Sequence, residues 1–283
     1  MARVEIRACD LTLVADIEGP EGAPTVVLLH GGGQTRHSWA DAMRALAARG
    51  YRVISYDARG HGDSGWSAAG AYRLDDRAED LAAVLHGTRA SFALVGASLG
   101  GATAIQAAAR GLRPAALALV DIVPDAEPQG VARIVNFMRG NPGGFASLKE
   151  AVDAVAAYNP ERPRPSDPTG LMRNLRRGDD GRLRWHWDPR IVEAEPQVHH
   201  DEVRRSARIL SEETTLPVLL VRGLRSDVVS DAGVEAFRRM MPRLAVDDVA
   251  GAGHMVAGDR NDAFNASVLK FLDRHMPVPG VRA

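Results

Sequence analysis

The 283-residue sequence has one cysteine, two lysines and no long apolar run. Cys9 has no partner for an internal disulfide, so nothing demands an oxidising compartment, and its side chain is expected to pack as a small apolar group. No stretch approaches the roughly 18 uninterrupted apolar residues of a transmembrane helix. The first residues include Arg3, Glu5, Arg7 and Asp10, which leave no apolar signal core. We therefore expect a cytoplasmic protein.

The chain also lacks an excess of charge of either sign. Its 35 basic and 36 acidic residues give a formal net charge of −1, so no electrostatic field favours nucleic acid or an anionic membrane surface. Hydrophobic residues make up 45% of the chain and charged residues 25%, as in ordinary globular proteins. We expect no nucleic-acid partner and no membrane association. A homodimer stays open.

Short apolar runs alternate with helical patterns along most of the sequence. Residues 4–16 alternate between apolar and polar around a turn near Cys9, which predicts an antiparallel hairpin. Strands are then predicted at 26–30, 52–57, 91–97, 115–122, 217–222 and 243–250. Helices are predicted at 38–49, 76–86, 98–110, 231–240 and 261–275. Continuous Val, Leu and Ile runs favour a mostly parallel sheet covered on both faces, and hence an α/β fold.

The alternation stops between about Pro124 and Glu212. This stretch is rich in proline and has helical patches at 131–138, 145–158 and 171–176. We therefore divide the chain into a core, residues 1–123 and 213–283, and an insert, residues 124–212. The length suffices for one large α/β domain with a sizeable hydrophobic core.

The most informative motif is Gly96-Ala97-Ser98-Leu99-Gly100. It follows the apolar run 92–95 and precedes an alanine-rich helical run at 102–109, which is the sequence form of a nucleophile elbow. Gly96 and Gly100 leave room for the strand and the helix to approach each other. The helix N-terminus directs free N–H groups and the positive end of its dipole at whatever Ser98 attacks. Ser98 is thus the candidate nucleophile.

Three further motifs surround this elbow in a fixed order. An apolar strand runs into His30-Gly31-Gly32-Gly33, residues 57–64 form the turn Asp-Ala-Arg-Gly-His-Gly-Asp-Ser, and residues 249–255 end a strand on His254. Over about residues 24–275, the four motifs resemble the α/β-hydrolase superfamily, in its lid-bearing branch of esterases, lactonases, non-haem haloperoxidases and epoxide hydrolases. The resemblance implies an eight-stranded α/β-hydrolase sheet with an N-terminal antiparallel hairpin, and a helical lid at 124–212.

A serine nucleophile needs a base that accepts its proton and a carboxylate that holds the base. On this fold the chain order is serine, acid, histidine. His254 is the expected base. Asp227, after the strand 217–222, is the expected acid because most of the family places its carboxylate there; Asp121, at the end of the strand 115–122, is the alternative. The oxyanion hole is expected from the backbone N–H groups of Gly32 and Leu99.

These residues and the resemblance imply a serine hydrolase without a cofactor. It would cleave a carboxylic ester or lactone of a small-to-medium apolar substrate through an acyl-enzyme. No metal is expected, because no histidines have metal-ligand spacing, and the turn at 57–64 is expected to be structural. Epoxide hydrolases and haloalkane dehalogenases carry aspartate where Ser98 stands, which argues against them. A haloperoxidase or perhydrolase, a carbon–carbon bond hydrolase and a non-catalytic ligand-binding protein are the alternatives.

Overall fold

A mixed eight-stranded sheet forms the centre of the protein. The computed structural model describes residues 1–283 except 161–166, 194–195, 213–214, 255, 257–260 and 281–283. The strand order is β1-β2-β4-β3-β5-β6-β9-β10, with β1 and β2 antiparallel to their neighbours and the remaining neighbours parallel. The strands are β1 (Ala2–Arg7), β2 (Thr12–Glu18), β3 (Thr25–Leu29), β4 (Arg52–Tyr56), β5 (Phe92–Ala97), β6 (Ala116–Val120), β9 (Val218–Gly223) and β10 (Ala245–Val249). The expected parallel sheet with an N-terminal antiparallel hairpin is confirmed.

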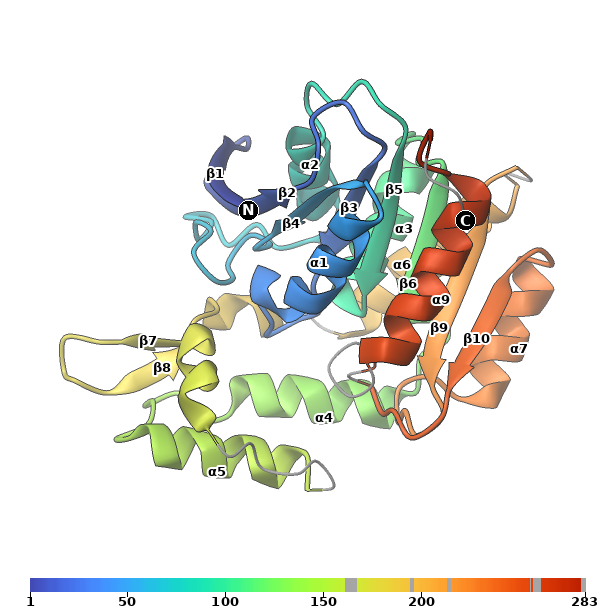
Figure 1. Ribbon diagram of the computed structural model, residues 1–283. Helices are drawn as coiled ribbons and strands as arrows, with labels where there is room; N and C mark the ends of the chain where they lie inside the picture. Colours follow the sequence, from blue (N-terminus) through green and yellow to red (C-terminus); the bar gives the residue numbers. More distant parts are fainter. Residues whose placement is uncertain (161–166, 194–195, 213–214, 255, 257–260, 281–283) are drawn as a thin grey trace.

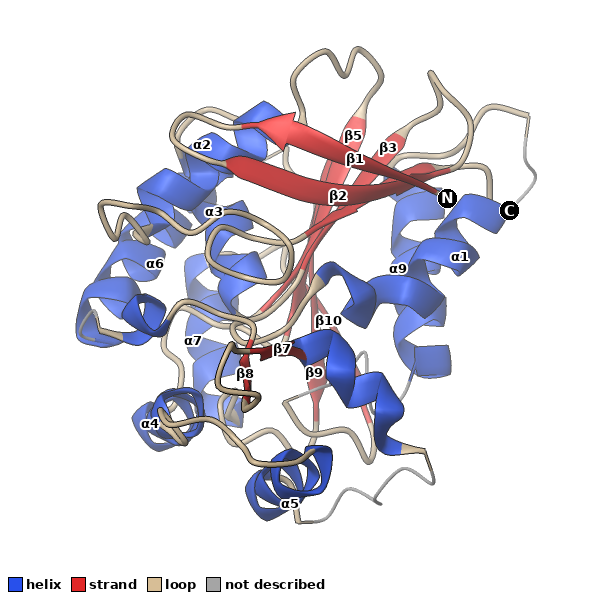
Figure 2. Cartoon of the chain, turned by 90° about the vertical axis from the view of Figure 1, so that its left-hand side faces the viewer, coloured by secondary structure: helices blue, strands red, loops and turns tan. Residues whose placement is uncertain are grey.

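Helices cover both faces of this sheet (Figure 2). One face carries α1 (Ala40–Ala48) and α9 (Asn261–His275). The other carries α2 (Leu74–Val84), α3 (Leu99–Ala109), α6 (Pro196–Ser211) and α7 (Asp231–Met240). In β3, Val26 and Leu28 pack toward α1 and α9, whereas Val27 and Leu29 pack toward α2 and α3. A strand buried on both sides has no polar face, which explains its continuous apolar sequence.

The insert lies beyond the carboxyl ends of the parallel strands (Figure 1). It begins with α4 (Pro128–Arg139) and α5 (Leu148–Tyr158), at two of the expected helical patches. The third patch differs from expectation, because a 3-10 helix at Pro168–Asn174 leads into an antiparallel pair, β7 (Leu175–Arg177) and β8 (Leu183–Trp185). This hairpin buries Leu175, Leu183 and Trp185 in a cluster of insert residues that also includes Tyr72 of the core. The last insert helix, α6, packs instead in the core beside α3.

The single cysteine, Cys9, lies in the turn between β1 and β2. Cys9 is exposed, so the expectation that it packs as an apolar side chain is wrong. The tight turn, in which the N–H of Ala8 donates to the carbonyl of Leu11 at 3.0 Å, buries Ala8 and leaves the next residue facing water. Among the described residues, no helix has the length and apolar character needed to cross a bilayer.

Candidate active site

Ser98 stands at a strained turn between β5 and α3. Its backbone has φ 47° and ψ −116°, a region that side-chain-bearing residues rarely adopt. A Cβ on Gly96 would lie 2.5 Å from the carbonyl oxygen of Gly100, and a Cβ on Gly100 would lie 2.2 Å from that of Leu29. Only glycine fits both positions, so the close approach expected of a nucleophile elbow is present.

His254 is held by a buried carboxylate. Its Nδ1 lies 2.7 Å from Oδ2 of Asp121, and its side chain is 14% exposed. A neutral imidazole that donates its Nδ1 proton to a carboxylate keeps the lone pair on Nε2, which is the arrangement a general base requires. Asp121 directly follows β6, the strand next to β5 in the sheet.

The carboxylate of Asp121 is fully buried and accepts two further hydrogen bonds. Oδ1 accepts from the backbone N–H of Gly223 at 3.1 Å, and Oδ2 accepts from the hydroxyl of Ser226 at 2.5 Å. The Ser226 oxygen in turn accepts backbone N–H groups of Val228 and Val229 at 3.1 and 3.2 Å. The loop after β9 therefore fixes the carboxylate through Ser226, a residue that the sequence analysis did not single out.

Asp227 does not make the contact expected of it. Its side chain is 37% exposed, and Oδ2 pairs with Nη1 of Arg133 on α4 at 3.1 Å. Helix α4 packs so closely on this loop that a Cβ on Gly130 would lie 2.1 Å from the Asp227 carbonyl oxygen. Asp227 therefore contacts Arg133 of the insert and water, whereas Asp121 contacts His254.

Gly32 and Leu99, the residues expected to form the oxyanion hole, line one cavity together with Ser98 and Asp121. Leu99 is the first residue of α3, so its N–H has no acceptor within the helix. The cavity volume is about 170 Å³. The structure therefore brings the candidate nucleophile and both candidate oxyanion donors to the same hollow.

The remaining walls of this cavity are mostly apolar. Helix α4 contributes Val131, Ile134, Val135 and Met138, and Ile191 and Val192 come from later in the insert. His199 and His200 of α6 add polar groups, and burial lowers the pKa of each below the usual value. An apolar hollow with a few polar groups suits a largely apolar ligand.

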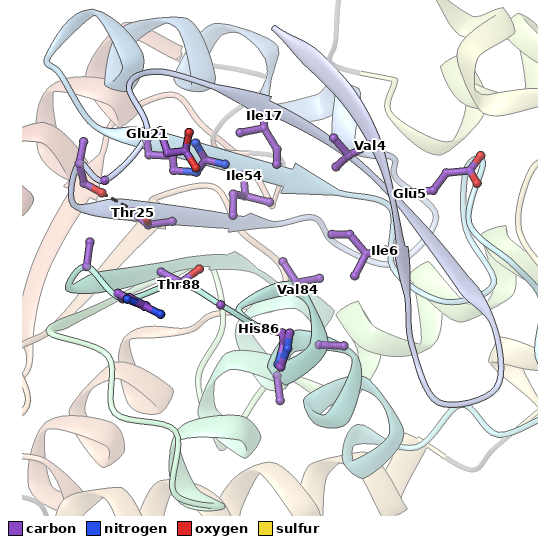
Figure 3. Close-up of a pocket in the computed structure, with 18 of the residues that line it drawn as sticks. Val4, Glu5, Ile6, Ile17, Glu21, Thr25, Ile54, Val84, His86 and Thr88 are labelled. Atoms are coloured by element: carbon purple, nitrogen blue, oxygen red, sulfur yellow. Dashed lines mark hydrogen bonds between the residues drawn. The ribbon is translucent and has the colours of Figure 1, made fainter.

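A larger cavity, of about 1180 Å³, lies elsewhere (Figure 3). Its labelled residues come from β1, β2, β3, β4, the turn before β3, and the end of α2 with the loop that follows it. This is the amino edge of the parallel strands, and none of the candidate site residues lines it. Since catalytic groups of open α/β sheets gather at the carboxyl edge, size alone is a poor guide here.

Three buried histidines meet beside the glycine turn, a cluster that the sequence did not reveal. The ring centroid of His61 lies 5.1 Å from that of His30 and 5.9 Å from that of His186. Burial lowers the pKa of all three below 6.5, that of His186 to about 4. Backbone groups engage all three rings. Within the part of the chain that the structure describes, no group of three or more side chains is arranged to hold a metal ion.

Comparison with known proteins agrees with the fold and the elbow. The family model described as "Alpha/beta hydrolase family" matches residues 26–267. The chain therefore belongs to this family, the class that the sheet order and the strand–turn–helix at Ser98 define.

Individual relatives indicate which activities occur among similar proteins. Esterase Rv0045c of Mycobacterium tuberculosis is 33% identical over 266 residues, which cover 89% of this chain and 83% of that protein. Its crystal structure has a TM-score of 0.75 at 29% identity, covering 96% of this chain and 91% of that one. The non-heme chloroperoxidase of Burkholderia pyrrocinia is 26% identical over 270 residues, 90% of this chain and 93% of that protein. These similarities support a hydrolase.

Proposed function

We propose that the chain is a serine esterase whose triad is Ser98, His254 and Asp121. The observation that carries the proposal is the 2.7 Å contact between Nδ1 of His254 and the buried carboxylate of Asp121. Asp227 is not part of this triad. The similarity to a mycobacterial esterase over most of both chains supports ester cleavage in particular.

The proposed reaction needs only these side chains and water. Oγ of Ser98 attacks the ester carbonyl carbon while its proton passes to Nε2 of His254, and Asp121 stabilises the imidazolium that forms. The backbone N–H groups of Gly32 and Leu99 bind the developing oxyanion. The intermediate collapses, the alcohol leaves with the proton from His254, and water releases the acid from the acyl-enzyme by the same steps in turn.

The cavity favours a compact, apolar ester or lactone. About 170 Å³ is below the roughly 300–1,000 Å³ of sites for drug-sized ligands, so a short acyl or alcohol part fits best. We propose that the insert acts as a lid, because α4 lines the same cavity as Ser98.

A second activity has a specific observation behind it. Similarity to a non-heme chloroperoxidase over 90% of the chain favours a perhydrolase reaction, in which hydrogen peroxide replaces water at the acyl-enzyme. Peracid formation from a short ester and peroxide would reveal it. A non-catalytic ligand-binding protein is the opposite extreme, and its serine would not react covalently.

The test combines labelling with hydrolysis. A fluorophosphonate probe should label the wild type at Ser98, identified by peptide mass, and short-chain nitrophenyl esters should be hydrolysed. Ser98→Ala should lose labelling and about 10³-fold or more in kcat. Asp227→Asn is the matched control and should keep both. Turnover near the wild-type rate in Ser98→Ala would remove the serine mechanism.

A further inference from the structure

The N–H of Gly32, a proposed oxyanion donor, belongs to the peptide group between Gly31 and Gly32. Hydrogen bonds to the carbonyl of Gly31 fix the orientation of this peptide group. A trans peptide is planar, so the direction of the Gly31 carbonyl sets the opposite direction of the Gly32 N–H. That carbonyl accepts from Nδ1 of His30 at 2.8 Å and from the backbone N–H of Gln34 at 3.1 Å. His30 is oriented in turn, because its Nε2 accepts from the N–H of Ala58 at 2.9 Å.

The next residue, Gly33, is held by two histidines. Its N–H donates to Nε2 of His61 at 3.1 Å, and its carbonyl lies 3.4 Å from Nε2 of His186. Gly33 has φ +72°, in the left-handed region that glycine adopts without steric strain. Ordering three consecutive glycines loses much conformational entropy. The side chains that form hydrogen bonds with their peptide groups therefore determine the direction of the Gly32 N–H.

The proton on His186 can be placed from its partner. Nδ1 accepts from the backbone N–H of Gly62 at 2.6 Å, and a backbone N–H is always a donor. Nε2 therefore carries the proton and donates to the Gly33 carbonyl. The ring is 1% exposed, and Trp187 lies at right angles to it with 5.3 Å between centroids.

His186 differs from the other two histidines in its origin. His30 and His61 belong to the turns after β3 and β4, close to Gly33 in the core, whereas His186 lies 153 residues away in the insert. Through His186, the insert thus contacts the glycine turn of the core. Met138 of α4 lies beside the same turn, since a Cβ on Gly32 would be 3.5 Å from its sulfur.

We infer that His186 is a positioning residue for the oxyanion hole, through which the insert sets the orientation of the Gly31–Gly33 turn. This rests on the proposed function. The Nε2 proton donated to Gly33 is the part of His186 that matters for the reaction. The Nδ1 contact with Gly62 seats the ring.

Two substitutions separate these contacts. His186→Gln places an amide N–H near the position of Nε2 and keeps a donor for Gly33. His186→Asn places an oxygen near Nδ1 and keeps only the acceptor for Gly62. We expect kcat to fall about 10–100-fold in His186→Asn with KM changed less than threefold, because a displaced donor weakens transition-state binding. His186→Gln should recover most of this loss.

A control variant loosens the insert without touching the turn. The Arg182 guanidinium donates to the carbonyls of Gly143 and Gly144, each at 2.7 Å, so Arg182→Ala weakens insert packing alone. Its kcat should match the wild type. If His186→Asn also keeps wild-type kcat, or loses no more than Arg182→Ala, the inference is overturned. Fluorophosphonate labelling of the wild type must succeed in either case, and its failure would overturn the proposed function instead.

A trifluoromethyl ketone inhibitor supplies a second readout, since its adduct with serine places an oxyanion in the hole. Its affinity should fall in His186→Asn in proportion to kcat, as transition-state mimics require. The wild type tests the geometry without any substitution. Nitrogen-15 resonances of the His186 ring should show the proton on Nε2, and a proton on Nδ1 would contradict the inference.

Discussion

The loops after β6 and β9 each place an aspartate at the carboxyl edge of the sheet, and the two carboxylates have opposite surroundings. Asp121 is fully buried and accepts from His254, Ser226 and the N–H of Gly223. Asp227 is 37% exposed and pairs with Arg133. Two aspartates at the same edge of the sheet can therefore have quite different contacts.

Ser226, in the loop after β9, supports the carboxylate that follows β6. It stands next to Asp227 in the sequence, yet its hydroxyl donates across to Asp121. Asp121 itself has φ 50°, so the chain bends sharply just after β6, and its N–H donates to the carbonyl of Val221 at 2.8 Å. The loop after β9 thus supports the carboxylate that the loop after β6 places against His254, and this carboxylate is the acid in the proposed triad.

The strongest way to break this comparison is to remove the charge of Asp121. Asp121→Asn keeps the shape but loses the carboxylate that holds His254 in its tautomer and stabilises the imidazolium. In a serine-protease triad the equivalent change costs about 10⁴-fold in kcat, and we expect a loss of about 10³–10⁴-fold here. Steady-state hydrolysis of a short ester measures it, with circular dichroism to show that the variant is folded.

The buried histidines, unlike Asp227, are expected to make the free energy of unfolding depend on pH in the acid range. The folded-state pKa values of His30, His61 and His186 are lowered, so the unfolded chain binds protons more readily. The contribution of the neutral histidines to the free energy of unfolding is then fully present above about pH 6.5 and is lost as the pH falls toward 4. With a pKa of about 4, His186 alone accounts for a loss of up to about 3 kcal/mol in the free energy of unfolding as the pH falls from about 6.5 to 4.

Urea unfolding between pH 7.5 and pH 4.5 measures this dependence. The loss of stability should be smaller in His186→Gln, which has no ring to protonate. Asp227→Asn should follow the wild type, because its side chain is already hydrated. An unchanged pH dependence in His186→Gln would show that this histidine is not a source of the acid sensitivity.

A smaller loss is expected when the support is removed and the acid is kept. Ser226→Ala deletes the hydroxyl that donates to Asp121 and accepts from Val228 and Val229. A hydrogen bond to a charged group contributes about 1.5–3 kcal/mol, part of which water can replace, so kcat should fall about tenfold. Ser226→Thr keeps the hydroxyl and should restore much of the rate. If Thr and Ala lose equally, the hydroxyl is not the relevant group.

The smallest effect belongs to Asp227. Its ion pair with Arg133 is solvent-exposed, and such pairs contribute about 0.2–1 kcal/mol. Asp227→Asn should therefore change kcat less than about threefold and thermal stability only slightly. A loss comparable to that of Asp121→Asn would reverse the comparison.

The sequence was sufficient to predict the elements that depend on local pattern. The apolar runs predict the six inner strands, and the glycines around Ser98 predict the elbow because only glycine tolerates those contacts. In the turn at 57–64, the carboxylate of Asp57 accepts the backbone N–H groups of Arg36 and Asp63.

What the sequence could not supply is the direction of a side chain after a strand ends. Asp121 and Asp227 both follow strands of the same edge, and only the loop conformations decide which one meets His254. The contact of His186 with Gly33 spans 153 residues and has no local signal. The hairpin at β7 and β8 differs from the helical patch that residues 171–176 predict, because Leu175 pairs with β8 and is buried in a cluster that joins the insert to Tyr72 of the core.

The most direct test of the account is the Nδ1 proton of His254, observed by NMR in protein labelled with nitrogen-15 histidine. A proton shared with a buried carboxylate is shielded from exchange with water, so a far-downfield signal should appear in the wild type and in Asp227→Asn. It should be lost or strongly shifted in Asp121→Asn. A signal that survives Asp121→Asn and disappears in Asp227→Asn would contradict the assignment of Asp121 as the acid.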